Sequence, residues 1–286
     1  MRYYQLCHRG EPVLAAETES AVYDLTAATR DLDSFDALFR AASVTDQSPD
    51  AVAAGRFDDA DELDRDALAE CELPLPVDEV WAAGVTYRIS EEARTEESGT
   101  PQMYIDVYDA ERPEIFFKSS RARTVGPGEA IGVRGDSDWN VPEPELGVVL
   151  YRGEPVGYTV GNDVSSRAIE GANPLYLPQA KIYDRCCALG PCVSTDVSDP
   201  HDLELSMTIT RDGRTVYEDE TTTAEMVRTC EELVSYLTRH NSLPEVTVLL
   251  TGTSLVPEEG FTLQPEDHVT IDIEGIGRLS NPVVGV

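Results

Sequence analysis

Residues 143–163 have the sequence EPELGVVLYRGEPVGYTVGND, in which two apolar runs flank a short polar segment. The runs at 146–150 and 156–160 have the length and composition of β-strands. Arg152-Gly153 lies between them and is typical of a tight turn. The sequence therefore predicts a β-hairpin whose open end carries the residues just before the first run and just after the second.

Glu143 and Glu145 lie at that open end, with Pro144 between them. Because side chains alternate along an extended chain, both carboxylates point to the same face. Pro144 cannot donate a ladder hydrogen bond, which suits the entrance of a strand. The hairpin returns Asp163 to the level of the two glutamates, so we expect three carboxylates to lie together.

Three clustered carboxylates repel one another unless a cation lies between them. The neighbouring sequence offers no His or Cys, and an oxygen-only set favours a hard divalent ion. We predict an Mg²⁺ site, with Mn²⁺ and Ca²⁺ as alternatives, formed by Glu143, Glu145 and Asp163. Three protein ligands leave positions open for water or a chelating substrate. Taken alone, the two glutamates are equally compatible with the surface of an acidic protein.

The chain is strongly acidic, with 54 Asp and Glu against 22 Lys and Arg in 286 residues and a formal net charge of −32. Such a chain repels nucleic acid and anionic membranes, so neither is an expected partner. The acidic residues are spread along the chain between aliphatic runs, which argues against disorder. Concentrated salt screens this self-repulsion, so we interpret the protein as halophilic.

The sequence also indicates a cytoplasmic protein. No apolar stretch approaches the length that spans a bilayer, and the first residues, MRYYQLC, lack the apolar segment of a signal peptide. The six cysteines form no CxxC pair. In a cytoplasmic chain of this length we expect them to be free and mostly buried thiols.

Leu73-Pro74-Leu75-Pro76 divides the chain into a small N-terminal domain, residues 1–75, and a catalytic domain, residues 76–286. The first domain is predicted to contain a hairpin of residues 3–7 and 12–16, and a helix carrying Leu32, Phe35, Leu38 and Phe39.

The second domain is mostly short strands, predicted at 80–85, 115–118, 203–211, 214–217, 247–251 and 269–273. Its clearest helix spans 225–240, with Thr222 and Glu225 as a capping box. One helix among many strands predicts a β-rich α+β fold.

Basic residues are scarce in this chain, so the two lysines that lie in apolar segments stand out. Lys118 follows Ile115-Phe116-Phe117, and Lys181 ends the segment LYLPQAK at 175–181. A lysine in such a place is paired with carboxylates or moves protons. After the strand at 247–251, the Gly252-Thr253 backbone and hydroxyl groups offer donors to a carboxylate.

From Trp81 onward the chain resembles the fumarylacetoacetate hydrolase superfamily over roughly two-thirds of its length, in family order. The matching segments are AGVTY (83–87), FFKSS (116–120), EPELGVVL (143–150), GYTVGNDVSSR (157–167), ALGP (188–191), LLTGT (249–253) and IEGIG (273–277). The resemblance implies a rolled mixed β-sheet with a small N-terminal domain, and a homodimer or homotetramer. It also implies that Glu143, Glu145 and Asp163 bind Mg²⁺ or a related ion, and that Lys181 lies beside the metal.

The chain departs from the hydrolases and decarboxylases of that superfamily at one position. They carry a His soon after the Gly-x-x-Tyr segment to activate water, whereas this chain has Ser90 there. The segment 172–181 instead resembles the branch that dehydrates 2-keto-3-deoxy-pentonates (2-dehydro-3-deoxy-D-arabinonate or xylonate) to 2,5-dioxopentanoate in pentose degradation. A dehydration needs no hydrolytic water, so the missing His fits this expectation.

Residue roles follow from that chemistry. Lys181 is the first candidate for proton transfer and Glu114 the second. The candidates for holding the 2-keto sugar acid are Arg88, Lys118, Ser119 and Thr253.

Two other interpretations stay open. An acylpyruvate hydrolase or oxaloacetate decarboxylase of the same superfamily would need another base, such as Glu92. A non-catalytic member would carry the acids only as part of its salt-adapted surface.

Overall fold

A computed structural model describes residues 1–8, 10–87, 106–108, 110–258 and 260–286. Its largest sheet is mixed, because β5 pairs with β16 in parallel while most other neighbours are antiparallel. In order across the sheet, its strands are β4 (Asp61–Leu63), β3 (Val22–Asp24), β2 (Glu11–Glu17), β1 (Arg2–His8), β13 (Cys187–Ser194), β11 (Glu154–Asp163), β10 (Pro144–Tyr151), β16 (Val246–Leu250), β5 (Glu79–Gly84) and β6 (Glu114–Ser120). The short strand β7 (Thr124–Val125) pairs with β13 in parallel.

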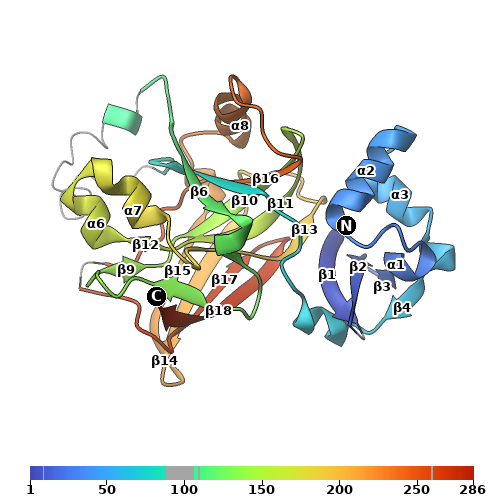
Figure 1. The fold of residues 1–286 in the computed structure, drawn as a ribbon, viewed down its shortest axis with the longest axis horizontal. Helices are drawn as coiled ribbons and strands as arrows, with labels where there is room; N and C mark the ends of the chain where they lie inside the picture. The colour runs from blue at the N-terminus through green and yellow to red at the C-terminus, as the bar shows by residue number, and fades with distance from the viewer. Residues whose placement is uncertain (9, 88–105, 109, 259) are drawn as a thin grey trace.

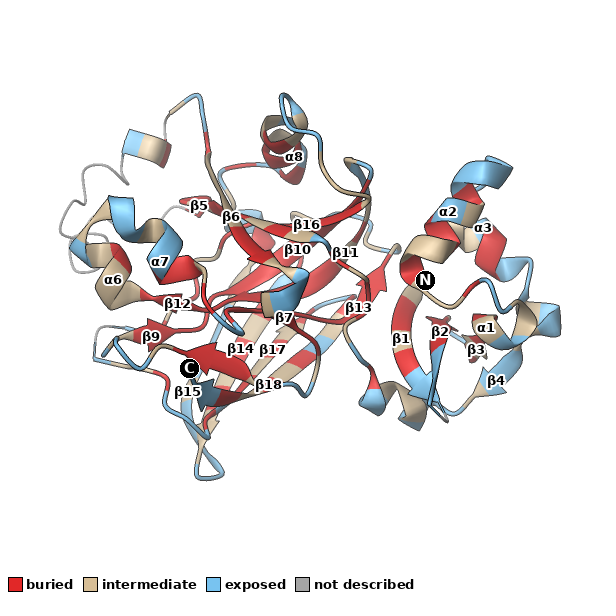
Figure 2. Cartoon of the chain, viewed as in Figure 1, coloured by how far each residue is buried: buried red, intermediate tan, exposed pale blue. Residues whose placement is uncertain are grey.

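A second sheet packs against the first, as Figure 1 shows. Its strands, in order, are β15 (Arg214–Thr222), β14 (Glu204–Arg211), β17 (His268–Ile273), β18 (Gly277–Gly285) and β8 (Ile131–Val133). Leu146 and Val148 of β10 join Met207 of β14 and Ile271 of β17 in one buried apolar cluster. Figure 2 shows the central strands buried along their length, and every residue of β10 is buried. The predicted β-rich α+β fold is therefore confirmed.

Helices lie around these sheets and two small strands lie beside the site. The α-helices whose two ends both lie among the described residues are α1 (Leu25–Ala28), α2 (Phe35–Thr45), α3 (Pro49–Ala54), α6 (Arg167–Ala172), α7 (Leu177–Lys181) and α8 (Cys230–Thr238). The 3-10 helices are η1 (Phe57–Asp59), η2 (Arg65–Glu70), η3 (Arg121–Arg123), η4 (Pro174–Tyr176) and η5 (Thr223–Glu225). Strands β9 (Asn140–Val141) and β12 (Ser165–Ser166) pair with each other. Within the described ranges, the structure contains no helix long and apolar enough to cross a membrane.

The N-terminal elements gather on one side of the molecule (Figure 1). Strand β1 nevertheless continues the large sheet, because Arg2 pairs with Ser194 and Tyr3 with Val193 of β13. The rings of Phe39 and Tyr151 lie 5.6 Å apart in a core that both parts share. The boundary at residue 75 therefore stays a prediction.

The start of helix α8 differs from the sequence prediction. The helix begins at Cys230, and its N-cap is Thr229, whose hydroxyl accepts from the Glu232 amide. Thr222 instead caps the short 3-10 helix η5. Between the two, Met226 forms a β-bridge with Tyr87 and Val227 donates to the Thr86 carbonyl, so tertiary contacts override the local helix signal.

Candidate metal centre

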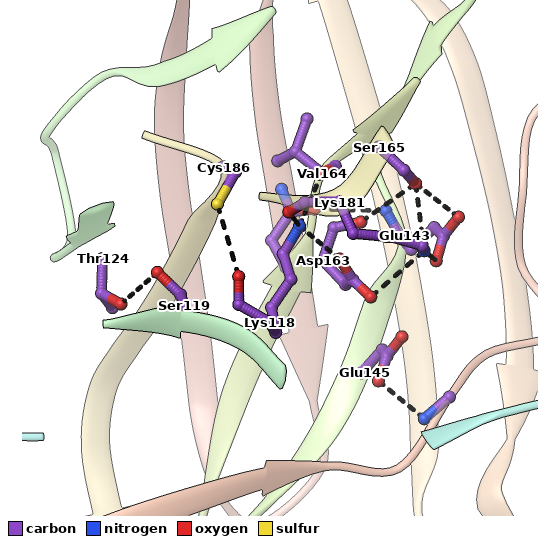
Figure 3. A network of polar contacts seen from close by, with 12 residues as sticks. Lys118, Ser119, Thr124, Glu143, Glu145, Asp163, Val164, Ser165, Lys181 and Cys186 are labelled. Atoms are coloured by element: carbon purple, nitrogen blue, oxygen red, sulfur yellow. Dashed lines mark hydrogen bonds and ion pairs between the residues drawn. The ribbon is translucent and has the colours of Figure 1, made fainter. Parts of the chain in front are cut away.

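The β10–β11 hairpin brings the three predicted carboxylates together. Pro144 pairs with Asn162, and the Asp163 amide donates to the Glu143 carbonyl at 2.9 Å. One oxygen from each of Glu143, Glu145 and Asp163 lies within 4.8 Å of the others. All three side chains are buried. Figure 3 shows them within a network of polar contacts. The hairpin prediction and its consequence for Asp163 are confirmed.

Glu143 is held by basic groups and a hydroxyl. Lys181 donates to its Oε2 at 2.6 Å and Ser165 to its Oε1 at 2.6 Å, while Arg167 Nη2 lies 3.3 Å from Oε1. Burial raises the pKa of this carboxyl, but Lys181 and Arg167 outweigh it and lower the pKa to about 2. Glu143 is therefore a carboxylate at any pH near neutrality.

Asp163 lies between the two lysines of the chain, which contains no others. Lys118 Nζ is 2.6 Å from its Oδ1, and Lys181 donates to its Oδ2 at 3.2 Å. Lys118 is fully buried and donates also to the carbonyls of Val164, at 2.8 Å, and Lys181, at 2.5 Å. Two of its protons are thereby donated to backbone carbonyls, and its positive charge lies beside Asp163.

Glu145 is the carboxylate with the least positive charge around it. Its Oε2 accepts from the Gly252 amide at 2.6 Å, the one bond drawn to it in Figure 3. Burial first, and then the charges of Asp163 and Glu143, raise its pKa well above the ordinary value. A buried carboxylate facing two others lacks a counter-charge, which a divalent cation supplies with the oxygen ligands it prefers. The three residues therefore fit a hard divalent ion.

The triad opens into a cavity of about 40 Å³, and several predicted residues border it. Glu114, Lys181 and Thr253 line this cavity beside the carboxylates. Glu114 lies against Gly84, where a Cβ would overlap its carboxylate. Strand β6 therefore presents Glu114 to the cavity only because its neighbour on β5 has no side chain.

The other predicted site residues are placed differently. Ser119 is buried, and its hydroxyl bonds to the Ser120 carbonyl and receives a bond from Thr124. Neither Ser119 nor Lys118 is among the described residues that border the cavity. Arg88, Ser90 and Glu92 lie outside the described residues.

Three residues that contact Glu143 or line the cavity were not singled out from the sequence. Ser165 and Arg167 contact Glu143, and Glu170 lines the cavity. Ser166 begins helix α6 by accepting from the Ile169 amide, so Arg167 and Glu170 are three residues apart on one helical face. The N-cap signal followed by Arg-x-x-Glu, next to a predicted metal ligand, is the pattern that would have found them.

Comparisons with known proteins agree with this geometry. Residues 79–284 match the family model described as "Fumarylacetoacetate (FAA) hydrolase C-terminal". A "Probable 2-keto-3-deoxyxylonate dehydratase" from Haloferax volcanii is 64% identical over 290 residues, covering 100% of both chains. The "2-dehydro-3-deoxy-D-arabinonate dehydratase" of Saccharolobus solfataricus is 46% identical over 217 residues, 73% of each chain.

The similarity to these dehydratases is also seen in a solved structure. This is the structure of "2-keto-3-deoxy-D-arabinonate dehydratase complexed with magnesium and 2,5-dioxopentanoate". It superposes with a TM-score of 0.84 at 37% identity, covering 100% of this chain and 99% of that one. With a buried carboxylate triad at the mouth of its central hairpin and a family match over most of its length, this chain belongs to the fumarylacetoacetate hydrolase family.

Proposed function

We propose that this protein is a hydro-lyase that dehydrates a 2-keto-3-deoxy-pentonate, derived from arabinose or xylose, to 2,5-dioxopentanoate with Mg²⁺. The observation that carries the proposal is the 64% identity, over the whole chain, to a relative named as a dehydratase of such an acid. The buried triad of Glu143, Glu145 and Asp163 agrees with the magnesium in the solved complex of the arabinonate dehydratase.

In this proposal Glu143, Glu145 and Asp163 hold the ion. Mg²⁺ held there would supply Lewis acidity toward the carboxylate and keto end of a 2-keto acid. The role of the protein is then to move two protons and to keep the acid oriented. For the loss of water, the C3 proton must leave and the C4 hydroxyl must gain a proton. The 5-hydroxy-2-oxopent-3-enoate that remains becomes 2,5-dioxopentanoate by tautomerisation, in which C5 and its hydroxyl each lose a proton while C3 and C4 each gain one.

Lys181 is the proposed acceptor of the C3 proton. Burial lowers its pKa, but Asp163 and Glu143 outweigh burial and raise it well above the ordinary value. Neutralising those two carboxylates removes the attraction that holds the proton, and burial then favours the neutral amine. The contacts of 2.6 Å to Glu143 and 3.2 Å to Asp163 tie the protonation of Lys181 to the charge of the site.

Glu114 is the proposed donor to the departing C4 hydroxyl, because it borders the same cavity as Lys181. Thr253, which also lines the cavity, and Arg88 are proposed to hold the substrate. Lys118 is proposed to support the site through its contact with Asp163, and Ser119 through its hydrogen bond with Thr124 at the end of β6.

We also propose that the protein is a cytoplasmic homodimer or homotetramer adapted to concentrated salt. The net charge of −32 and the Haloferax relative support the salt adaptation. Screening weakens repulsion between like charges over distances beyond about 3 Å at 1 M salt. Light scattering in concentrated KCl reports the oligomeric state.

Turnover tests the proposed function directly. The protein is incubated in concentrated KCl with Mg²⁺ and 2-keto-3-deoxy-arabinonate or its xylonate counterpart. An NADP-linked aldehyde dehydrogenase then detects the semialdehyde product. We expect product with Mg²⁺ and none after chelation. Absence of product, together with release of pyruvate from acylpyruvates or oxaloacetate, would replace the dehydratase with a hydrolase or decarboxylase.

A further inference from the structure

Glu170 lines the cavity but takes no part in the proposed proton transfers. It lies on helix α6, is 9% exposed and lines the same cavity as the carboxylate triad. Its Oε2 is enclosed and has no hydrogen-bond partner in the described part of the chain. No ion pair joins the Glu170 side chain to any described residue. An enclosed carboxylate oxygen without a donor is unfavourable unless a ligand supplies one.

The start of helix α6 fixes where Glu170 points. Ser166 caps the helix and donates to the Ser137 hydroxyl at 2.7 Å, and the Arg167 amide donates to the Trp139 carbonyl at 2.9 Å. Arg167 in turn contacts Glu143. Since Glu170 is one turn further along the same face, the helix holds it beside the metal centre.

Glu170 is nevertheless separate from the metal ligands. The group of carboxylates whose oxygens lie within 4.8 Å of one another contains Glu143, Glu145 and Asp163, and Glu170 is not a member. A 2-keto acid chelated at the triad keeps its carboxylate and keto ends there. The rest of a five-carbon acid then extends from the triad along the residues that line this cavity, and Glu170 is one of them.

We propose that Glu170 accepts a hydrogen bond from the terminal C5 hydroxyl of the substrate and rejects acids with a second carboxylate at that end. An ionised carboxylate only accepts hydrogen bonds, so it pairs with a hydroxyl and repels another carboxylate. This inference rests on the proposed function and adds a determinant of specificity to it. It separates hydroxylated keto acids from dicarboxylic ones such as 2-oxoglutarate or oxaloacetate.

Three five-carbon 2-oxo acids test this assignment. They are 2-oxopentanoate, 5-hydroxy-2-oxopentanoate and 2-oxoglutarate, which differ only in a methyl, hydroxymethyl or carboxylate at C5. Each lacks the C4 hydroxyl, so none can be dehydrated. Their dissociation constants are measured by calorimetry with the Mg²⁺-loaded protein. For wild type we expect the hydroxylated acid to bind about tenfold more tightly than 2-oxopentanoate, and 2-oxoglutarate to bind most weakly.

Two variants isolate the role of Glu170. Glu170→Gln keeps the size of the side chain and one acceptor. In this variant 2-oxoglutarate should bind about tenfold more tightly than in wild type, while the hydroxylated acid keeps part of its affinity advantage over 2-oxopentanoate. In Glu170→Leu the hydroxylated acid should lose its advantage over 2-oxopentanoate. Glu218→Gln, at an exposed position of β15, should match wild type. Thermal unfolding with Mg²⁺ identifies any variant that fails to fold, in which case the other decides.

The outcomes separate this inference from the proposed function. If wild type dehydrates the pentonate but the folded Glu170 variants rank the three acids as wild type does, Glu170 does not read the C5 group. If wild type itself prefers 2-oxoglutarate, the assignment is also overturned. If the pentonate is not dehydrated at all, the proposed function fails first.

Discussion

At the scale of single residues, the three carboxylates of the site have different electrostatic surroundings. Glu143 is paired with Lys181 and Arg167, and Asp163 with both lysines, whereas Glu145 has one backbone donor. The sequence identified the triad because spacing within one hairpin places the side chains. It did not reveal these differences, because they depend on groups from β6, α6 and the loop after β16.

The pKa of Glu145 leads to a prediction for Glu145→Gln. Because that pKa is raised in the ion-free protein, the folded state retains a proton that the unfolded state releases above the ordinary carboxyl pKa. The free energy of unfolding therefore falls as pH rises, by up to about 1.4 kcal/mol per pH unit. Without Mg²⁺, Glu145→Gln escapes this loss, so at neutral pH we expect it to be more stable than wild type.

Mg²⁺ should reverse the order of stability of wild type and Glu145→Gln. Binding to the folded state alone raises the melting temperature of wild type but not that of Glu145→Gln, which should also lose turnover. Thermal unfolding with chelator and with millimolar Mg²⁺ measures both effects, and Glu218→Gln serves as a control. Equal Mg²⁺ stabilisation of wild type and Glu145→Gln would remove Glu145 from the metal ligands.

At the scale of elements, local patterns predicted what local geometry determines. The β10–β11 hairpin followed from its two apolar runs and Arg152-Gly153, and Arg152 indeed has a positive φ of 54°. The predicted start of α8 was wrong because residues 226 and 227 pair with the chain after β5, which is a contact between segments far apart in sequence. Glu170 was not singled out for a similar reason, since the direction of its helix depends on the β9–β12 pairing and on the bond from the Arg167 amide to the Trp139 carbonyl.

Alanine substitutions at two glycines at the edge of the site should have contrasting effects on activity and stability. In Gly84→Ala the new Cβ overlaps only the end of the Glu114 side chain, which can rotate away. We expect the protein to keep its stability and to lose about a hundredfold in kcat, because Glu114 is displaced. In Gly252→Ala the Cβ overlaps the Thr86 hydroxyl and lies 2.8 Å from the Ala83 carbonyl, at a φ of +84°.

Gly252→Ala should therefore destabilise the fold by about 2 kcal/mol or more. Urea unfolding and steady-state kinetics, carried out on both variants, measure the contrast. A Gly84→Ala protein with normal kcat would exclude Glu114 from proton transfer. One that unfolds as readily as Gly252→Ala would assign Gly84 to the packing of the strands instead.

At the scale of the whole molecule, charge is distributed with a sharp contrast between surface and site. The chain carries a net charge of −32, yet its two lysines are both buried at the metal centre. Composition predicted the acidic surface, and apolar neighbours predicted that the lysines are buried. The division at residue 75 is harder to judge from sequence, because β1 and the shared core join the two parts.

Because both lysines contact Asp163, lysine labelled with ¹³C at Cε gives two signals that report on this one site. We predict that Mg²⁺ shifts the Lys181 signal with saturation at one ion per chain, and that Glu145→Gln abolishes the shift. Lysine signals that stay unchanged at Mg²⁺ concentrations that support turnover would contradict a metal centre built on Glu143, Glu145 and Asp163.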